Sequence, residues 1–396
     1  MQSAIYIGII IGVAIYISEL IDLQERLAWA DNLTPPSPKR WWQPLSTLAF
    51  STVAITGGVV FYNGQSYTVD SLDILVMLSS GFTILSFLWA HDKQNSLPSV
   101  LRWGVLGCTA IALGLALEFE QCVIIVASGS MIYLLIGVAE ELRAGSLRKG
   151  RHYRFFGGVG CNKQATHCIF VGLSSVYLSN VSLLPLFVTL ALLFFSLVIL
   201  ILTRSIANWW SIFIVLSVWL FLAYPDTRNE LTKYILIGAT TALILLTTNS
   251  GRGIVHWLIF VGRTNVKITY LAGRWDIWRF VWSDVMKYPF FGQGYGSFWN
   301  VNNQARFLQS GPLNIPLTHS HSIYLELLLN GGFVALTLFF MMGAVGAFYA
   351  MDESGPAGAF VAALIAYVVF QGVVESAFTL PQFRSFTFIL ILVSIQ

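Results

Sequence analysis

Long apolar runs alternate with short polar segments along the whole chain. The runs are about 17–25 residues long, the length at which an α-helix crosses a hydrocarbon core about 30 Å thick. They are continuous, whereas the strands of a transmembrane β-barrel are short and alternate apolar with polar residues. The pattern therefore predicts an all-α, polytopic membrane protein in which residues 1–396 form a single membrane domain. We expect about twelve transmembrane helices, near residues 3–19, 45–62, 72–90, 100–117, 121–138, 165–181, 184–202, 206–223, 231–248, 320–349, 357–375 and 380–395.

The composition supports this class and excludes others. Hydrophobic residues make up 56% of the chain and charged residues 10%, whereas soluble proteins carry about 25% charged residues. The net charge of +3 gives no reason to expect a nucleic-acid partner. The cysteines show no C-x-x-C spacing, so neither a zinc site nor a disulfide framework is expected. The first apolar run, Ala4–Ile17, lacks the basic segment and cleavage site of a signal peptide and is interpreted as the first span.

The longest segment without a predicted span, residues 249–318, is rich in Arg, His, Trp and Gly. It contains GRWDIWRFVWSDVMKYPFFGQGYGSFW (residues 273–299) and enters the next apolar run through THSHSIYLELLLNGG (residues 318–332). A loop of this length in a compact protein is usually functional. We therefore expect the chemistry of the protein to lie in this loop.

Three arginines are candidates for binding an anionic group. Arg204 stands where two apolar runs meet, and a charge deep in a bilayer costs a few kcal/mol and normally has a partner or a task. Arg274 opens a segment whose apolar spacing predicts a short amphipathic helix over residues 274–286, with Arg279 further along it. A guanidinium group suits phosphate oxygens. The alternatives are a snorkelling side chain for Arg204 and a surface arginine near lipid headgroups for Arg274.

His319 and His321 fall immediately before an apolar helix. A histidine at the membrane boundary is well placed to transfer protons near neutral pH. On a helix, His321, Tyr324 and Leu328 would share one face. The H-x-H pair also resembles part of a metal site, but Glu326 stands too far along the helix to complete it. We therefore expect no metal and no cofactor.

Glycines and aromatic residues complete the candidate site. The glycines of PFFGQGYGSFW allow tight turns and close approach of the backbone to a ligand, but their spacing is not that of a dinucleotide fingerprint. Several aromatic side chains of the loop have the shape of platforms on which sugars stack, and interfacial anchoring is the alternative. They are Trp275, Trp278, Trp282, Tyr295 and Trp299.

In order and spacing, these motifs resemble the O-antigen ligase and O-antigen polymerase superfamily over roughly residues 200–340. The family pattern has a Ser-Arg pair at a helix start, then G-R-x-x-x-W, then P-x-x-G-x-G-x-G-x-F. It ends with His and Asn, Ser or Gln, nine residues and Gly. This chain offers Thr203-Arg204, Gly273-Arg274 with Trp278, the run Pro289–Phe298, and His321-Ser322 followed by Gly332.

The chain departs from the pattern at two positions. Thr203 replaces the usual Ser, and Ala335 stands where the family often has Gly, Thr or Tyr. The segment Ser250–Arg252 is a rival for the Ser-Arg motif, so Arg252 remains an alternative to Arg204. We prefer Arg204, because it borders an apolar helix and stands about 70 residues before Arg274, as the family pattern expects.

The resemblance implies a membrane glycosyltransferase that needs no metal or cofactor. Its partners would be a glycan on undecaprenyl diphosphate, an acceptor glycan or glycolipid, and the lipid bilayer. The resemblance implies catalytic roles for Arg204, Arg274 and His321. Arg252, Arg279, His319, Tyr324, Tyr295 and Trp278 are expected to contact the substrate. Within the superfamily, the sequence GYGSFW most resembles exopolysaccharide-type polymerases and favours polymerisation of polysaccharide repeat units. The alternative is transfer to lipid A-core, the reaction of an O-antigen ligase. A transporter of lipid-linked sugars is a further alternative, but the chain shows no internal repeat of the kind many transporters have.

Basic residues conflict with the orientation that the resemblance implies. The family acts at the periplasmic face of the bacterial inner membrane, whereas cytoplasmic loops are rich in Lys and Arg. Counting spans from two basic clusters puts the long loop in the cytoplasm. Either the count is off by one span, or one basic loop is external. We prefer the periplasmic assignment, because one misjudged span reverses the count. The clusters are Arg26, Lys39 and Arg40, and Arg143, Arg148, Lys149, Arg151 and Arg154.

Overall fold

The structure is a computed structural model, and it describes residues 2–32, 52, 54–56, 58, 69–147, 153–224, 274–310, 317–353 and 355–395. The predicted span at 231–248, most of the span at 45–62, and Arg252 lie outside these residues. Within the described part the chain is helical and has no strand, which confirms the all-α class. The helices are α1 (Gln2–Asn32), α3 (Ser71–Leu85), η1 (Ser86–Trp89), α4 (Lys93–Ala116), α5 (Phe119–Arg143), α6 (Cys161–Asn180), α7 (Leu186–Thr203), α8 (Ile206–Ala223), α11 (Arg274–Val285), α12 (Val301–Ser310), α13 (Ile323–Asp352), α14 (Pro356–Val374), η4 (Ala377–Thr379) and α15 (Phe383–Val393).

Eight helices of the described residues are long and apolar enough to cross a membrane. They are α1, α4, α5, α7, α8, α13, α14 and the continuous pair α3–η1. Two predicted spans are not among these eight helices. The prediction at 165–181 falls on α6, whose buried face carries polar residues such as Thr166, His167 and Ser174. The prediction at 380–395 falls on α15, which has only 11 residues, all of them buried.

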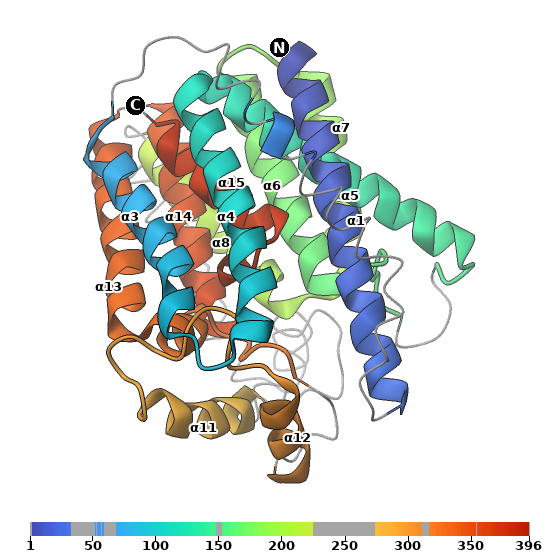
Figure 1. Cartoon of the computed structure of the whole chain (residues 1–396). Coiled ribbons are helices and arrows are strands. Elements are labelled where there is room, and N and C mark those ends of the chain that lie inside the picture. The colour runs from blue at the N-terminus through green and yellow to red at the C-terminus, as the bar shows by residue number, and fades with distance from the viewer. Residues whose placement is uncertain are drawn as a thin grey trace, which may run out of the picture. The chain divides into compact units, whose positions relative to one another are not determined.

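The chain divides into two compact units. The first comprises residues 1–129, 268–346 and 371–396, and the second comprises residues 130–267 and 347–370. In the first unit, α15 packs against α3 and α4. Figure 1 shows α11 and α12 beyond one end of α3, α4 and α13, at the end from which α13 starts. In the second unit, α6 packs against α7 and α8.

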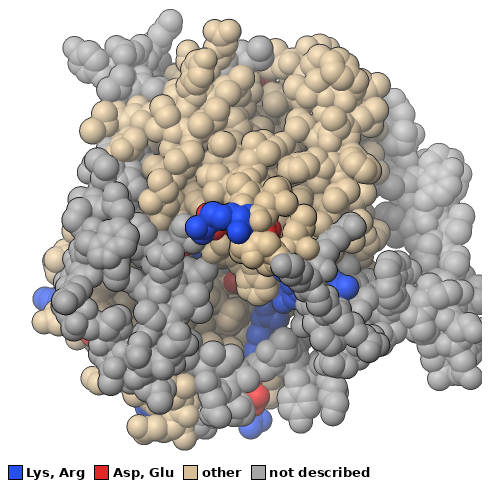
Figure 2. Space-filling view, turned by 90° about the vertical axis from the view of Figure 1, so that its right-hand side faces the viewer, with Lys and Arg blue, Asp and Glu red and all other residues tan. Residues whose placement is uncertain are grey.

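Few charged atoms appear on the described part of the face drawn in Figure 2, where uncharged residues predominate. Many large apolar side chains of the predicted spans are exposed, for example Leu78 at 58%, Phe187 at 75% and Phe194 at 70%. Monomeric soluble proteins rarely expose apolar surface on this scale. The exposed apolar residues therefore match helices that face lipid.

The glycine-rich loop, Pro289–Trp299, is joined to α13 by backbone hydrogen bonds. Gly332 has φ 62° and ψ −156°, which interrupts α13. An uninterrupted helix would bond the amides of residues 333 and 334 to the carbonyls of residues 329 and 330. The loop supplies partners to all four groups instead. Phe333 N donates to Pro289 O (2.7 Å), Val334 N to Phe290 O (3.2 Å), Gln293 N to Leu329 O (2.7 Å) and Gly294 N to Asn330 O (3.0 Å).

This replacement of helical hydrogen bonds explains two of the family glycines. A Cβ on Gly332 would lie 2.3 Å from the carbonyl carbon and oxygen of Phe290. A Cβ on Gly292 would lie 2.6 Å from the backbone of Asn330 and Gly331. Both residues have φ 62°, a backbone conformation that favours glycine. Because the kink satisfies its own polar groups, it can persist at a membrane boundary.

Candidate active site

Helix α11 confirms the predicted amphipathic helix, and Arg274 is its first described residue. One face of the helix buries Ile277, Val281 and Val285. These side chains join an apolar cluster with residues of the glycine-rich loop, α12 and α13, including Phe298, Phe307, Leu328 and Leu329. The cluster fixes α11 against the start of α13. Arg274 is partly buried, whereas Arg279 is exposed.

The segment before α13 is held in place through Ser320. Trp278 Nε1 donates to Ser320 O at 3.1 Å, and Ser320 N donates to the carboxylate of Glu326. The same carboxylate accepts a hydrogen bond from Trp299 Nε1 at 3.0 Å. Ser320 is fully buried. Side chains from α11, the glycine-rich loop and α13 therefore converge on the residue between the two histidines.

His321 adopts a strained backbone conformation. Its φ is 55°, in the left-handed region that non-glycine residues rarely adopt. Its amide donates to Nδ1 of His319 at 3.3 Å, and the two imidazole rings lie 4.0 Å apart, edge to face. Such strain, of order 1–3 kcal/mol, tends to occur at functional sites. The helix begins only at Ile323, so His321 precedes α13 rather than sharing its face with Tyr324.

Glu375 is a residue of this site that the sequence analysis missed. Its Oε1 lies 3.8 Å from Nδ1 of His321, and the carboxylate is largely buried. Ser322 Oγ donates to Gly372 O at 3.2 Å, which ties the end of α14 to the segment before α13. The one available signal was a single acidic residue at the end of an otherwise uncharged apolar run, because such residues normally have a task.

Opposing effects act on the imidazole of His321. Burial lowers its pKa, the Glu375 carboxylate raises it, and the positive charge of Arg274 lowers it further. The net result is a pKa below the ordinary histidine value. The ring is therefore neutral at neutral pH and has one nitrogen that can accept a proton.

An apolar groove of about 490 Å³ reaches Ser322, next to His321, and three of the six predicted substrate contacts line it. Trp278, Arg279 and Tyr324, predicted separately, come together here. Ser322, the neighbour of His321, lies in the same wall. Trp275 and Trp282 are about half exposed, at 54% and 49%. The lining consists of Trp275, Trp278, Arg279, Trp282, Ser322, Tyr324, Leu325 and Val373.

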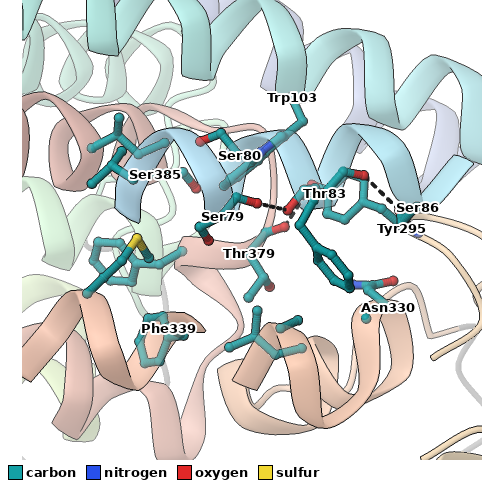
Figure 3. Close-up of a pocket in the computed structure, with 18 of the residues that line it drawn as sticks. Ser79, Ser80, Thr83, Ser86, Trp103, Tyr295, Asn330, Phe339, Thr379 and Ser385 are labelled. Carbon is teal, nitrogen blue, oxygen red and sulfur yellow. Dashed lines mark hydrogen bonds between the residues drawn. The ribbon is translucent and has the colours of Figure 1, made fainter. Parts of the chain in front are cut away.

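Tyr295 lies apart from this groove, in the interior of the first unit. Its hydroxyl donates to Thr379 O at 2.7 Å, and burial raises its pKa well above the ordinary tyrosine value. It borders a separate cavity of about 60 Å³ that is rich in hydroxyl groups. Figure 3 shows Ser79, Ser80 and Thr83 on one side of this cavity, with Asn330 and Phe339 on another. This environment gives Tyr295 a structural task.

Arg204 belongs to the second unit and ends α7 in a left-handed conformation, with φ 48°. Arg154 Nε donates to Thr203 O at 3.0 Å. On the other side, Ser205 Oγ donates to Asn162 Oδ1 at 3.0 Å and accepts from Asn208 Nδ2 at 2.9 Å. Polar side chains thus hold both neighbours of Arg204. Two of the three predicted catalytic residues therefore occupy strained backbone, which the sequence did not indicate.

His319, His321 and Glu375 are also the residues here that could hold a metal ion. One ligand atom from each lies within 4.8 Å of the other two. The carboxylate of Glu326 instead accepts hydrogen bonds from Ser320 and Trp299. The third ligand that the H-x-H pair lacked in sequence comes from the end of α14.

Comparison with known proteins finds a family match for part of the chain. Residues 191–340 match the family model described as O-antigen ligase. No curated protein and no solved structure matches the chain. The matched region contains Arg204, Arg274, His321 and the glycine-rich loop. Residues 191–340 are thus similar to the O-antigen ligase family, in a chain whose described residues include eight helices long and apolar enough to cross a membrane.

Proposed function

We propose that the protein transfers a glycan from undecaprenyl diphosphate to an acceptor hydroxyl, and that it polymerises polysaccharide repeat units at the periplasmic face of the inner membrane. One observation carries the proposal. A buried carboxylate lies 3.8 Å from a strained, partly exposed histidine, next to an apolar groove that begins at the adjacent residue, Ser322. This arrangement combines a proton acceptor with a surface for a lipid-linked substrate.

The reaction exchanges two bonds at the anomeric carbon of the donor sugar. The acceptor oxygen forms a bond to this carbon while the carbon–oxygen bond to the diphosphate breaks. The acceptor proton passes to the imidazole of His321, and the diphosphate leaves with the bonding electron pair. Direct displacement inverts the configuration at the anomeric carbon.

The arginines stabilise the leaving group. Negative charge grows on the diphosphate as the bond breaks, and positive groups in a site of low dielectric constant stabilise such charge strongly. Arg274, partly buried at the start of α11, is the first of these groups. Arg204 is the second candidate that the family resemblance implies, and it ends α7 within the second unit. Arg252 remains the alternative to Arg204.

His321 acts as the general base, and Glu375 orients it. The lowered pKa of His321 keeps the ring neutral, as a proton acceptor must be. A carboxylate beside a histidine stabilises the imidazolium ion that forms. The ring of His319 also contacts that of His321 and restricts its movement.

The groove binds the part of the donor next to the diphosphate. Its lining is almost wholly apolar and suits isoprenoid units, with Arg279 available to phosphate oxygens. The exposed rings of Trp275 and Trp282 are sugar-stacking surfaces at its rim. The acceptor glycan approaches from the aqueous side of the same histidine.

A ligase reaction is the second candidate, and the description of the matched family favours it. The two reactions share the donor and the chemistry and differ in the acceptor. Purified protein with a synthetic undecaprenyl-diphosphate glycan distinguishes them. A ladder of longer lipid-linked chains identifies a polymerase, whereas glycan on added lipid A-core identifies a ligase.

The same assay tests the whole proposal. We expect product in the presence of EDTA, because no metal takes part in the transfer. Arg274→Ala and His321→Ala should insert normally into the membrane yet lose almost all activity. Transfer at near wild-type rates by both variants would refute the proposed roles, as would product formation that depends on an added metal ion.

A further inference from the structure

The cluster of His319, His321 and Glu375 has the composition of a site for a transition-metal ion. Imidazole nitrogens and a carboxylate are ordinary ligands of Zn²⁺, and two histidines with one glutamate form a known set. The three ligand atoms already lie within 4.8 Å of one another.

The fold brings the ligands together from distant parts of the chain. The left-handed turn at His321 places its ring 4.0 Å from that of His319. The hydrogen bond from Ser322 to Gly372 holds the end of α14 against this turn. Glu375 is thereby presented to Nδ1 of His321 at 3.8 Å. All three residues belong to the first compact unit.

We propose that His319, His321 and Glu375 form a binding site for Zn²⁺, and that the bound ion inhibits glycan transfer. A neutral imidazole has a single nitrogen with a free lone pair. When an ion binds this nitrogen, the lone pair is used, and the other ring nitrogen already carries a hydrogen. His321 can then no longer accept a proton. The binding stands on geometry alone, whereas the inhibition rests on the proposed function.

Arg274 limits the affinity of this site. Its positive charge lowers the pKa of His321 and would repel a divalent cation at the same place. The negative charge of Glu375 offsets only part of this repulsion. Three protein ligands also hold an ion less tightly than the four of a closed structural site. We therefore expect reversible binding, with a dissociation constant in about the micromolar range.

Binding is measured on the full-length protein in detergent, purified without a histidine tag and stripped with EDTA. Zn²⁺ is titrated in competition with a chromogenic chelator. We expect a single ion per chain, and an affinity at least about tenfold weaker in His319→Ala and in Glu375→Gln. Thermal unfolding without metal shows whether each variant is folded, and Glu375→Gln preserves the shape of the side chain.

Two control variants separate the site from other ligands. His91, in the same unit, contacts the ring of Tyr288 and lies outside the cluster. Cys108 is an exposed free thiol. His91→Ala and Cys108→Ser should both bind Zn²⁺ as the wild type does. Equal binding by the wild type, His319→Ala and Glu375→Gln would overturn the proposed site.

Activity then tests the inhibition separately. Zn²⁺ should suppress transfer by the wild type, and EDTA should restore it. In His319→Ala, the Zn²⁺ concentration that halves the remaining activity should rise by the same factor as the dissociation constant. Binding without suppression would overturn the inhibitory role. If the protein binds Zn²⁺ but transfers no glycan even after EDTA has removed the ion, the proposed function is refuted. The proposed metal site would still stand.

Discussion

Glu375 Oε1 lies 3.8 Å from Nδ1 of His321 where the end of α14 meets the start of α13. Glu375 follows the last residue of α14, and His321 precedes the first residue of α13 by two positions. The pair therefore depends on how two helix ends pack. In the proposed reaction, this packing places the carboxylate whose charge stabilises the imidazolium ion.

Glu375→Gln should lower kcat about tenfold, which is less than the loss of about 10²–10⁴-fold expected for His321→Ala. The amide keeps the size of the side chain but cannot stabilise an imidazolium ion by charge. KM should change little, because Glu375 is not among the groove-lining residues. Transfer kinetics at varied donor concentration measure both constants. Glu353, which is exposed, offers the matched control Glu353→Gln, and an equal effect of the two variants would contradict the pairing.

Arg274→Ala should reduce transfer about 10²–10³-fold, the usual cost of losing a group that stabilises charge in the transition state. Arg274→Lys should fall between Ala and the wild type, because it keeps the charge but loses the forked geometry. The initial rate with a synthetic donor reports both effects.

Lys287→Ala is the control for Arg274. Lys287 follows the same helix and pairs with Asp284 at 2.7 Å, but Asp284 also pairs with Arg306 at 2.5 Å. Removing this exposed lysine should leave the rate unchanged, because surface ion pairs contribute little. A comparable loss in Lys287→Ala would point to general electrostatics of the loop rather than to Arg274.

Gly332→Ala should destabilise the protein markedly. The required backbone conformation alone costs about 1–3 kcal/mol for a non-glycine residue, and the added Cβ would lie 2.3 Å from the backbone of Phe290. Gly343 stands in the same helix, and its Cβ would meet nothing within 4 Å. Gly343→Ala should leave Tm unchanged or raise it, because alanine favours a helix over glycine by about 1 kcal/mol. Equal Tm values for the two variants in detergent would contradict the hydrogen-bonded kink.

Tyr295→Phe should lower stability by about 1–3 kcal/mol, because Thr379 O loses a buried donor. The effect should depend on pH. Burial raises the pKa of Tyr295 well above its ordinary value of about 10. The unfolded chain therefore releases this proton first as the pH rises. The stability from the hydroxyl is complete below about pH 10 and declines above it. The Tm difference between wild type and variant should narrow there, and a constant difference would contradict the buried hydroxyl.

The hydrophobic pattern alone determined the all-α class and the elements around the site. The amphipathic spacing predicted α11 with Arg274 at its start, and the change from polar to apolar residues placed His319 and His321 just before α13. These are properties of local sequence, since helix periodicity and capping act within a few residues. The order of the short motifs also sufficed to predict the family that residues 191–340 match.

The nature of α15 could not be predicted in this way. Its apolar sequence reads as a span, yet it is an 11-residue helix enclosed by protein. Hydropathy reports removal from water and does not distinguish lipid from a protein interior. The pattern likewise gave no sign of the strained backbone at Arg204 and His321.

Sequence by itself determined which elements this protein has and which chemical groups stand beside them, because those depend on neighbours along the chain. Tertiary structure alone decided that Glu375 faces His321 and that the glycine-rich loop completes the hydrogen bonds of α13 at Gly332. Both relationships join segments far apart in sequence. Each depends on packing and on the need to satisfy buried polar groups, and neither leaves a periodic signal in the chain.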